Sequence, residues 1–267
     1  MGRFDFKTRT GQISAIIQSG DQDAQAFFNR VMAAGGSLTL TEQSAITQLV
    51  IDMKTAGIWD GMKAIYPMVG ASAAACAQNL KSSSFTGTFT SGWTFASTGV
   101  TGNGTSAYFD PSLTSASHLS LNSAHIAFYS RTNSALNMIM AGTQSLYVLA
   151  RWTNFHANNS VENVGGGINT GATTAGFFMS NRTIGTEMKY QINGSIQTDS
   201  TTSAATASIQ ATQSLFMGAQ NTASFGIRLY NNYSTAWYSI GDGLNNTQAT
   251  DYYTAVQAFQ TSLSRQV

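Results

Sequence analysis

Apolar and polar residues alternate at short range through the long middle part of the chain, residues 77–241. Each alternating run is short and is bounded by Gly, Ser or Asn, a spacing typical of strands in a two-sheet sandwich or jelly roll. The runs expected to form strands are residues 77–81, 93–97, 106–110, 125–131, 138–141, 146–152, 176–181, 187–193, 195–198, 206–209, 215–219 and 236–240. The pattern therefore predicts a mainly β chain that forms a two-sheet antiparallel jelly-roll sandwich.

Segments on both sides of this β region show the period of a helix instead. Asp21 or Asp23 is expected to cap a first helix, and Thr41 a second helix that ends at Gly57. A third short helical piece is expected over residues 58–66, and a closing helix over residues 246–263. The apolar stripes are Phe27, Phe28, Val31 and Met32 in the first helix, Ile46, Leu49, Val50 and Met53 in the second, and Tyr252, Val256, Phe259 and Leu263 in the last. Helices this short are not stable alone in water, so each is expected to pack on another surface.

The chain is therefore divided into three zones. Residues 1–20 form an N-terminal arm in which Phe4 and Phe6 alternate with charged residues. Residues 21–70 form a helical region expected to dock the protein on a partner. Residues 71–267 form the β-sandwich with its closing helix.

Charge is scarce, and this narrows the range of functions. Charged residues make up 9% of the chain, against roughly 25% in typical soluble domains. Nucleic-acid-binding proteins usually carry a clear excess of basic residues. The net charge of +1 shows no such excess. No stretch approaches the ~20 apolar residues that a membrane span needs, and the first ten residues carry no apolar core of a signal peptide. The sequence predicts no membrane insertion, folding in a cytoplasm, and a single buried Cys76 without a disulfide.

The residues do not group into a catalytic or metal site. Glycosidases need two carboxylates roughly 5–10 Å apart, and residues 67–241 hold only Asp110, Glu162, Glu187 and Asp199 as acidic side chains. The histidines His118, His125 and His156 share no metal-ligand spacing on one element. Isolated Asp110 and Asp199 do not support a calcium site. We expect no enzyme activity, no metal and no cofactor.

Sugar binding has better support, in residues 151–159 (RWTNFHANN). A sugar ring stacks on a flat aromatic face, and its hydroxyl groups need fixed donors and acceptors. Trp152, Asn154, Phe155 and His156 supply both types directly after an expected strand. We take these four residues as the candidate carbohydrate-binding site; the alternative is that Trp152 is a core residue, as expected for Trp93 and Trp237.

The last third of the chain carries a resemblance to a known family. A hairpin at residues 189–194 (KYQING), with its tight turn at Asn193 and Gly194, is followed by a strand at 215–218 (LFMG), and then by a strand and a helix in residues 240–253. This order resembles the end of concanavalin A-like (laminin-G-like) lectin domains. Segments 56–59, 63–67, 119–122, 126–131, 240–244 and 255–259 add a resemblance to tailed-bacteriophage virion proteins that carry such a domain. The small-residue run 71–77 departs from that pattern, which has a more polar connection there.

The resemblance implies a structural component of a bacteriophage virion, associated with head, tail or fibre and assembled in the host cytoplasm. Its partners would be other virion proteins (capsid, tail or fibre), further copies of itself, with a trimer as the first expectation, and a host surface glycan bound weakly. The alternatives are a stand-alone carbohydrate-binding lectin and, less favoured by the scarce carboxylates, a glycan-degrading enzyme.

Overall fold

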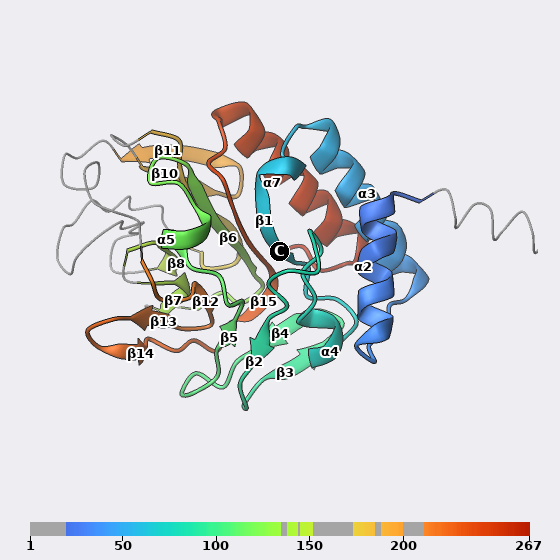
Figure 1. The fold of residues 1–267 in the computed structure, drawn as a ribbon, viewed down its shortest axis with the longest axis horizontal. Coiled ribbons are helices and arrows are strands. Elements are labelled where there is room, and N and C mark those ends of the chain that lie inside the picture. Colours follow the sequence, from blue (N-terminus) through green and yellow to red (C-terminus); the bar gives the residue numbers. More distant parts are fainter. Residues whose placement is uncertain (1–19, 135–137, 144, 152–172, 185–187, 200–210) are drawn as a thin grey trace, which may run out of the picture.

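The protein consists of three layers, in which helices cover one face of a large sheet and a smaller sheet covers the other (Figure 1). The computed structural model describes residues 20–134, 138–143, 145–151, 173–184, 188–199 and 211–267. Among these residues, no helix is long and apolar enough to cross a membrane.

The helical layer is built from α2 (Gln22–Ala33), α3 (Leu40–Thr55) and α7 (Asn246–Ser262). Local side-chain caps fix where each helix begins. Asp21 accepts hydrogen bonds from the first free N–H groups of α2, while Thr39 with Glu42 and Asn245 with Gln248 form capping boxes on α3 and α7. Short helices η1 (Trp59–Gly61), α4 (Ala73–Cys76) and α5 (Ser115–His118) occupy the connections.

The large sheet has eight strands, and β15 (Ser234–Gly241) is its central member. β15 pairs with β6 (Ala124–Ser130) on one side and, on the other, with β4 (Gly99–Thr101) and β1 (Met62–Tyr66). The remaining strands are β3 (Thr94–Ala96), β9 (Gly176–Arg182), β10 (Met188–Ile192) and β11 (Ser195–Asp199). Every strand pair in this sheet is antiparallel, in the order β11-β10-β9-β6-β15-β4-β3.

The smaller sheet has five strands in the order β2-β5-β12-β7-β8, again with antiparallel pairs. Its strands are β2 (Thr88–Phe89), β5 (Phe109–Asp110), β7 (Met138–Gly142), β8 (Tyr147–Arg151) and β12 (Phe216–Met217). A separate hairpin is formed by β13 (Gln220–Thr222) and β14 (Gly226–Arg228).

Alternation along the strands of the large sheet divides the interior into two cores. In β6, Ala127 and Tyr129 face the helices and join a core with α2, α3 and α7. Ile126 and Phe128 face the smaller sheet and join the second core. Successive side chains of a strand point to opposite faces, so one strand contributes to both cores.

The predicted fold class, a mainly β antiparallel two-sheet sandwich with helices near both ends, is confirmed. The turn at Asn193 and Gly194 is also confirmed, because both residues have positive φ, 45° and 86°, between paired strands. The division of the chain into domains at residues 20 and 70 stays a prediction, and the strand expected at 206–209 lies outside the described residues.

Several local predictions are wrong. The third helical piece is instead η1 followed by strand β1, which is hydrogen-bonded to β15. Thr39 rather than Thr41 caps α3. Residues 77–81 do not form a strand, and β1, β2, β4, β13 and β14 were not expected. Most of these strands have two or three residues, too few for the alternation of apolar and polar residues to mark them.

Candidate functional site

The predicted sugar-binding residues Trp152, Asn154, Phe155 and His156 lie outside the described residues. The strand expected before them is present, because β8 ends at Arg151. β8 is an edge strand of the smaller sheet. The carbohydrate site itself stays a prediction.

Three other residues singled out in the sequence are core residues. Trp237 is fully buried and donates a hydrogen bond from Nε1 to the Tyr252 hydroxyl, 3.0 Å away. Cys76 is a buried free thiol whose pKa is raised to about 12, chiefly by burial, so it stays protonated and unreactive. Trp93 is partly buried and packs at the edge of the core between the two sheets.

His125 is also internal, at the start of β6, with no exposed surface. Its Nδ1 lies 2.6 Å from the carbonyl oxygen of Asp242, and its Nε2 has no hydrogen-bond partner among the described residues. Burial is the largest cause that lowers the pKa of His125, to about 4, so the ring is neutral at pH 7. It is a buried histidine held by the backbone, and sequence reasoning left its role open.

Three of the segments that carry the family resemblance, residues 56–59, 63–67 and 240–244, come together at one place, which we call the seam. It joins the helical layer to the large sheet where β1 begins and β15 ends. Gln248 of α7 donates to the carbonyl of Gly57, 3.1 Å away, and the amide of Asp242 donates to the carbonyl of Gly61 at 2.9 Å. Lys63 Nζ lies 2.9 Å from an Asp242 carboxylate oxygen. Residues distant in sequence are thus linked by specific hydrogen bonds.

Arg265 closes the other end of this layer; its side chain is fully buried and forms no ion pair with a carboxylate of the described residues. Its guanidinium donates to the carbonyls of Met68, Pro67 and Ala236 at 2.8, 3.1 and 3.2 Å, and to the side-chain oxygen of Gln260 at 2.9 Å. Burial lowers the pKa of Arg265 to about 10, which still leaves it charged at pH 7. Backbone carbonyls therefore hold this cation in place of an acidic side chain.

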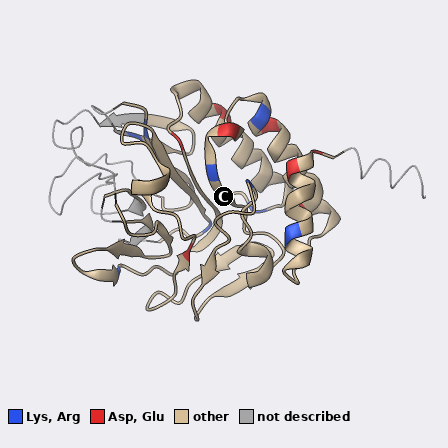
Figure 2. Cartoon of the chain, viewed as in Figure 1, with Lys and Arg blue, Asp and Glu red and all other residues tan. Residues whose placement is uncertain are grey.

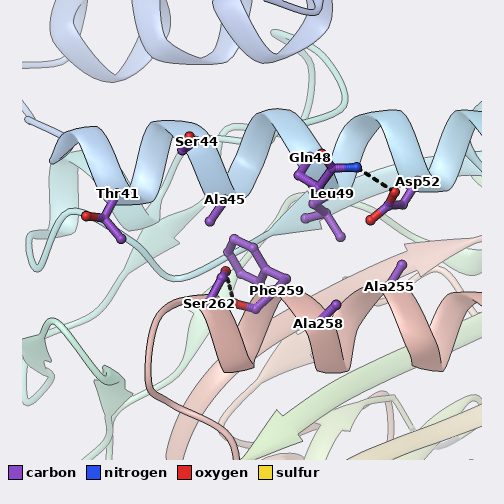
Figure 3. A pocket seen from close by; sticks show the side chains of 10 residues that line it. All are labelled: Thr41, Ser44, Ala45, Gln48, Leu49, Asp52, Ala255, Ala258, Phe259 and Ser262. Carbon is purple, nitrogen blue, oxygen red and sulfur yellow. Dashed lines mark hydrogen bonds between the residues drawn. The ribbon is translucent and has the colours of Figure 1, made fainter.

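A groove of about 260 Å³ lies between α3 and α7 (Figure 3). Thr41 and Ser262 lie at one end and Asp52 and Ala255 at the other, so the two helices run antiparallel. The groove is lined by Thr41, Ser44, Ala45, Gln48, Leu49 and Asp52 of α3 and by Ala255, Ala258, Phe259 and Ser262 of α7.

The groove has an apolar floor and a polar rim. Its floor is apolar, formed by Ala45, Leu49, Ala255 and Phe259, which are all buried. The rim is polar, and there Gln48 Nε2 donates to an Asp52 carboxylate oxygen at 2.8 Å. A single carboxylate beside hydroxyl and amide groups offers no acid–base pair. Among the described residues, no cluster of His, Cys, Asp and Glu has the arrangement of a metal site.

Acidic side chains gather on the helical side of the molecule, whereas the described part of the sandwich carries more Lys and Arg than Asp and Glu (Figure 2). The ion pairs found among the described residues follow this distribution. Lys54 pairs with Asp21 and Asp23, and Lys63 pairs with Asp242. The helical layer therefore holds most of the acidic side chains that the structure describes.

Comparisons with known proteins give only a slight likeness. No protein-family model matches the chain, and no curated protein matches it by sequence. One of the solved structures that it is similar to is domain 4 of AbnA, a GH43 extracellular arabinanase from Geobacillus stearothermophilus, in complex with arabinotriose. The identity is 13%, the TM-score is 0.42, and the match covers 72% of this chain and 98% of that one. A likeness of this size is too slight to bear on function.

Proposed function

We propose that this chain is a structural protein of a tailed-bacteriophage virion, associated with head, tail or fibre, that displays a lectin-like β-sandwich. One observation carries the proposal. Three of the six segments that resemble virion proteins, residues 56–59, 63–67 and 240–244, meet at the seam, where hydrogen bonds and an ion pair join Gly57, Lys63, Asp242 and Gln248. These contacts join the helical layer to the sandwich, which supports a role in which one part docks and the other is displayed.

The proposal assigns the helical layer to docking and the sandwich to display. The helical layer holds most of the described acidic residues and the groove between α3 and α7. It contacts other virion proteins or further copies of the chain, with a trimer as the first expectation. The protein carries no enzyme activity in this role, and purified protein is expected to release no reducing ends from host capsule or cell-wall sugars.

The virion role is tested by mass spectrometry of purified phage particles whose genome encodes this chain. Peptides of the chain should be present in gradient-purified particles at a fixed ratio to the major capsid protein. Their presence in the lysate together with their absence from the particles would overturn the proposal. A protein that is absent from particles but binds glycan arrays would be a stand-alone lectin instead.

A weak glycan contact through Trp152, Asn154, Phe155 and His156 is the finer part of the proposal. A single shallow site has about millimolar affinity, about −4 kcal/mol, so useful adhesion requires many copies acting together. Particles with Phe155→Ala should adsorb less to host cells than unmodified particles. Phe225→Ala is the matched control, because Phe225 is an exposed aromatic residue in the turn between β13 and β14. Equal adsorption of the two variants would exclude the glycan contact.

A further inference from the structure

The connection between β1 and α4, residues 67–72, has a strained backbone. Met68 and Ala71 have positive φ angles of 48° and 44°, and Gly70 has a φ angle of 74°. Glycine adopts this left-handed region freely, whereas the Cβ atom of any other residue comes too close to the backbone there. Such a conformation persists only where the surrounding structure fixes it. We call residues 67–72 the latch.

The guanidinium of Arg265 holds the carbonyl groups at the start of the latch. It donates to the carbonyls of Pro67 and Met68, at 3.1 and 2.8 Å. Arg265 follows directly after α7, and both it and Met68 have no exposed surface. A buried cation from the end of the chain is therefore bonded to the most strongly buried part of the strained connection.

A carboxylate holds the other side of the latch. Glu42 Oε1 accepts from the amide of Gly70 at 2.8 Å, while Oε2 accepts from the amide of Thr39 in the capping box of α3. Between the two charged groups, Cys76 Sγ donates to the carbonyl of Val69 at 3.2 Å. Hydrogen bonds to charged groups are roughly twice as strong as those between neutral groups. These bonds oppose the backbone strain and keep the latch closed.

The latch and the seam fasten opposite ends of the helical layer to the sandwich. Glu42 lies in the first turn of α3 and Arg265 lies after the last turn of α7. Because the two helices are antiparallel, both residues belong to the same end of the layer (Figure 3). In the described seam segments, residues 56–63 and 240–248, a positive φ occurs only at a glycine, Gly57. Of the two attachments, the latch is the strained one.

We propose that the latch opens locally: residues 67–72 relax to negative φ angles and residues 264–267 withdraw Arg265, while both sheets stay folded. Opening releases the strain as the hydrogen bonds are lost, so the open state lies closer in free energy to the closed state than the bonds alone indicate. Opening also uncovers the Cys76 thiol, which is bonded to the latch. The helical layer thus has one permanent and one releasable attachment. This inference does not depend on the virion role.

Alkylation of Cys76 by iodoacetamide in the native full-length protein measures the opening, because this is the single cysteine of the chain and it is buried. Arg265→Lys loses the planar group that reaches both carbonyls, and the rate should rise about tenfold. Ala71→Gly, at an exposed position, removes the steric cost of the closed state, and the rate should fall about threefold. Ser112→Gly is the matched control, because Ser112 is also exposed with a positive φ of 54° but lies outside the latch. It should leave the rate unchanged.

Urea separates local opening from unfolding of the whole chain. Local opening exposes little surface, so the alkylation rate should be nearly independent of urea below the unfolding transition. A rate that rises with the full urea dependence of global unfolding would overturn the inference, and so would a folded protein that is not alkylated. A rate for Ala71→Gly that is not below that of the parent, or equal rates for Ala71→Gly and Ser112→Gly, would also overturn it. These outcomes decide the question even if Arg265→Lys does not fold.

Discussion

The two faces of the large sheet are held to their neighbours in different ways. On the face toward the smaller sheet, aromatic rings dominate: Phe128 stacks on Phe178 with ring centres 5.1 Å apart, and Tyr66 stacks on Tyr238 at 5.9 Å. On the face toward the helices, buried polar groups are prominent, and His125, Tyr252 and Arg265 bond to defined partners. Apolar packing has no preferred direction, whereas hydrogen bonds fix an orientation. The helical layer is therefore oriented on the sandwich by several buried hydrogen bonds as well as by packing of Trp237 on Phe259. Fewer side-chain bonds join the described parts of the two sheets, from Tyr238 to the carbonyl of Leu215 and from Ser180 to that of Tyr147.

The largest loss of stability is expected from removal of an aromatic side chain on the face toward the smaller sheet. Phe128→Ala removes a fully buried ring between the sheets and leaves a cavity beside Phe178. The free energy of unfolding should fall by about 4 kcal/mol, measured by urea denaturation. Phe128→Leu should recover more than half of that loss, since it keeps most of the volume. A loss below about 1 kcal/mol for the Ala variant would contradict the role given to packing on this face.

Removal of the hydrogen bonds on the helical face should lower the free energy of unfolding somewhat less than Phe128→Ala does. Arg265→Lys keeps a positive charge, but one ammonium group does not replace the planar guanidinium that donates to Gln260, Met68, Pro67 and Ala236. Buried carbonyls lose their donors, and we expect a loss of about 3 kcal/mol in the same denaturation experiment. Arg131→Lys is the control, because Arg131 Nε donates to the single carbonyl of Arg265. Equal losses of stability for the two variants would contradict the view that the several hydrogen bonds of the Arg265 guanidinium stabilise the helical layer.

Acid should act on the helical face through His125. The pKa of His125 is about 4 in the folded protein and 6.5 in the unfolded chain, so below pH 6.5 the unfolded chain binds a proton that the folded protein does not. Stability should therefore fall as the pH drops from 6.5 to 4, by about 3 kcal/mol in total from this group. In His125→Asn this contribution is absent, and the slope of stability against pH should be shallower across that window. Parallel pH profiles for the two proteins would show that His125 does not titrate in this way.

The smallest loss of stability is expected from removal of a single hydroxyl group. Tyr252→Phe removes the group that accepts from Trp237 Nε1 and bonds Ser239, but Trp237 Nε1 keeps Ser239 Oγ at 3.2 Å. We expect a loss of about 1 kcal/mol and a red or blue shift of tryptophan fluorescence as the indole environment changes. The Tyr253→Phe variant of the half-buried neighbour should be nearly neutral. A loss as large as that of Phe128→Ala would erase the distinction between the two faces.

Elements with local signals could be predicted from the sequence. Asn245 as the cap of α7 and the stripe of Tyr252, Val256 and Phe259 depend on residues a few positions apart, and so does the turn at Asn193 and Gly194. β1 could not be predicted in this way. Four of its five residues are buried, so it has no alternating pattern, and its strand conformation is fixed by pairing with the distant β15.

The candidate site was less predictable than the fold. The groove needs α3 and α7, which are brought together only by the fold, and neither helix alone indicates a cleft. Arg265 bonds mainly to backbone carbonyls, which leave no mark in the side-chain sequence. The sequence signal that did exist, the small residues Ala45, Ala255 and Ala258 along two helix faces, resembles ordinary close helix packing.

The position of β15 in the chain determines the order in which the protein can fold. It is the central strand of the large sheet, yet it is the last of the described strands in the sequence. Tyr66 of β1 therefore cannot pair with Tyr238 until β15 has been synthesised. Ribosomes add ~5–20 residues per second, so β1, β4 and β6 emerge well before the strand that joins them and present open edges during that interval. Low-charge strand edges of this kind pair readily with other chains. Nascent chains that end before Ser234 should therefore aggregate rather than form a partial sandwich, and the yield of native protein should rise when chaperones cover the open edges during synthesis.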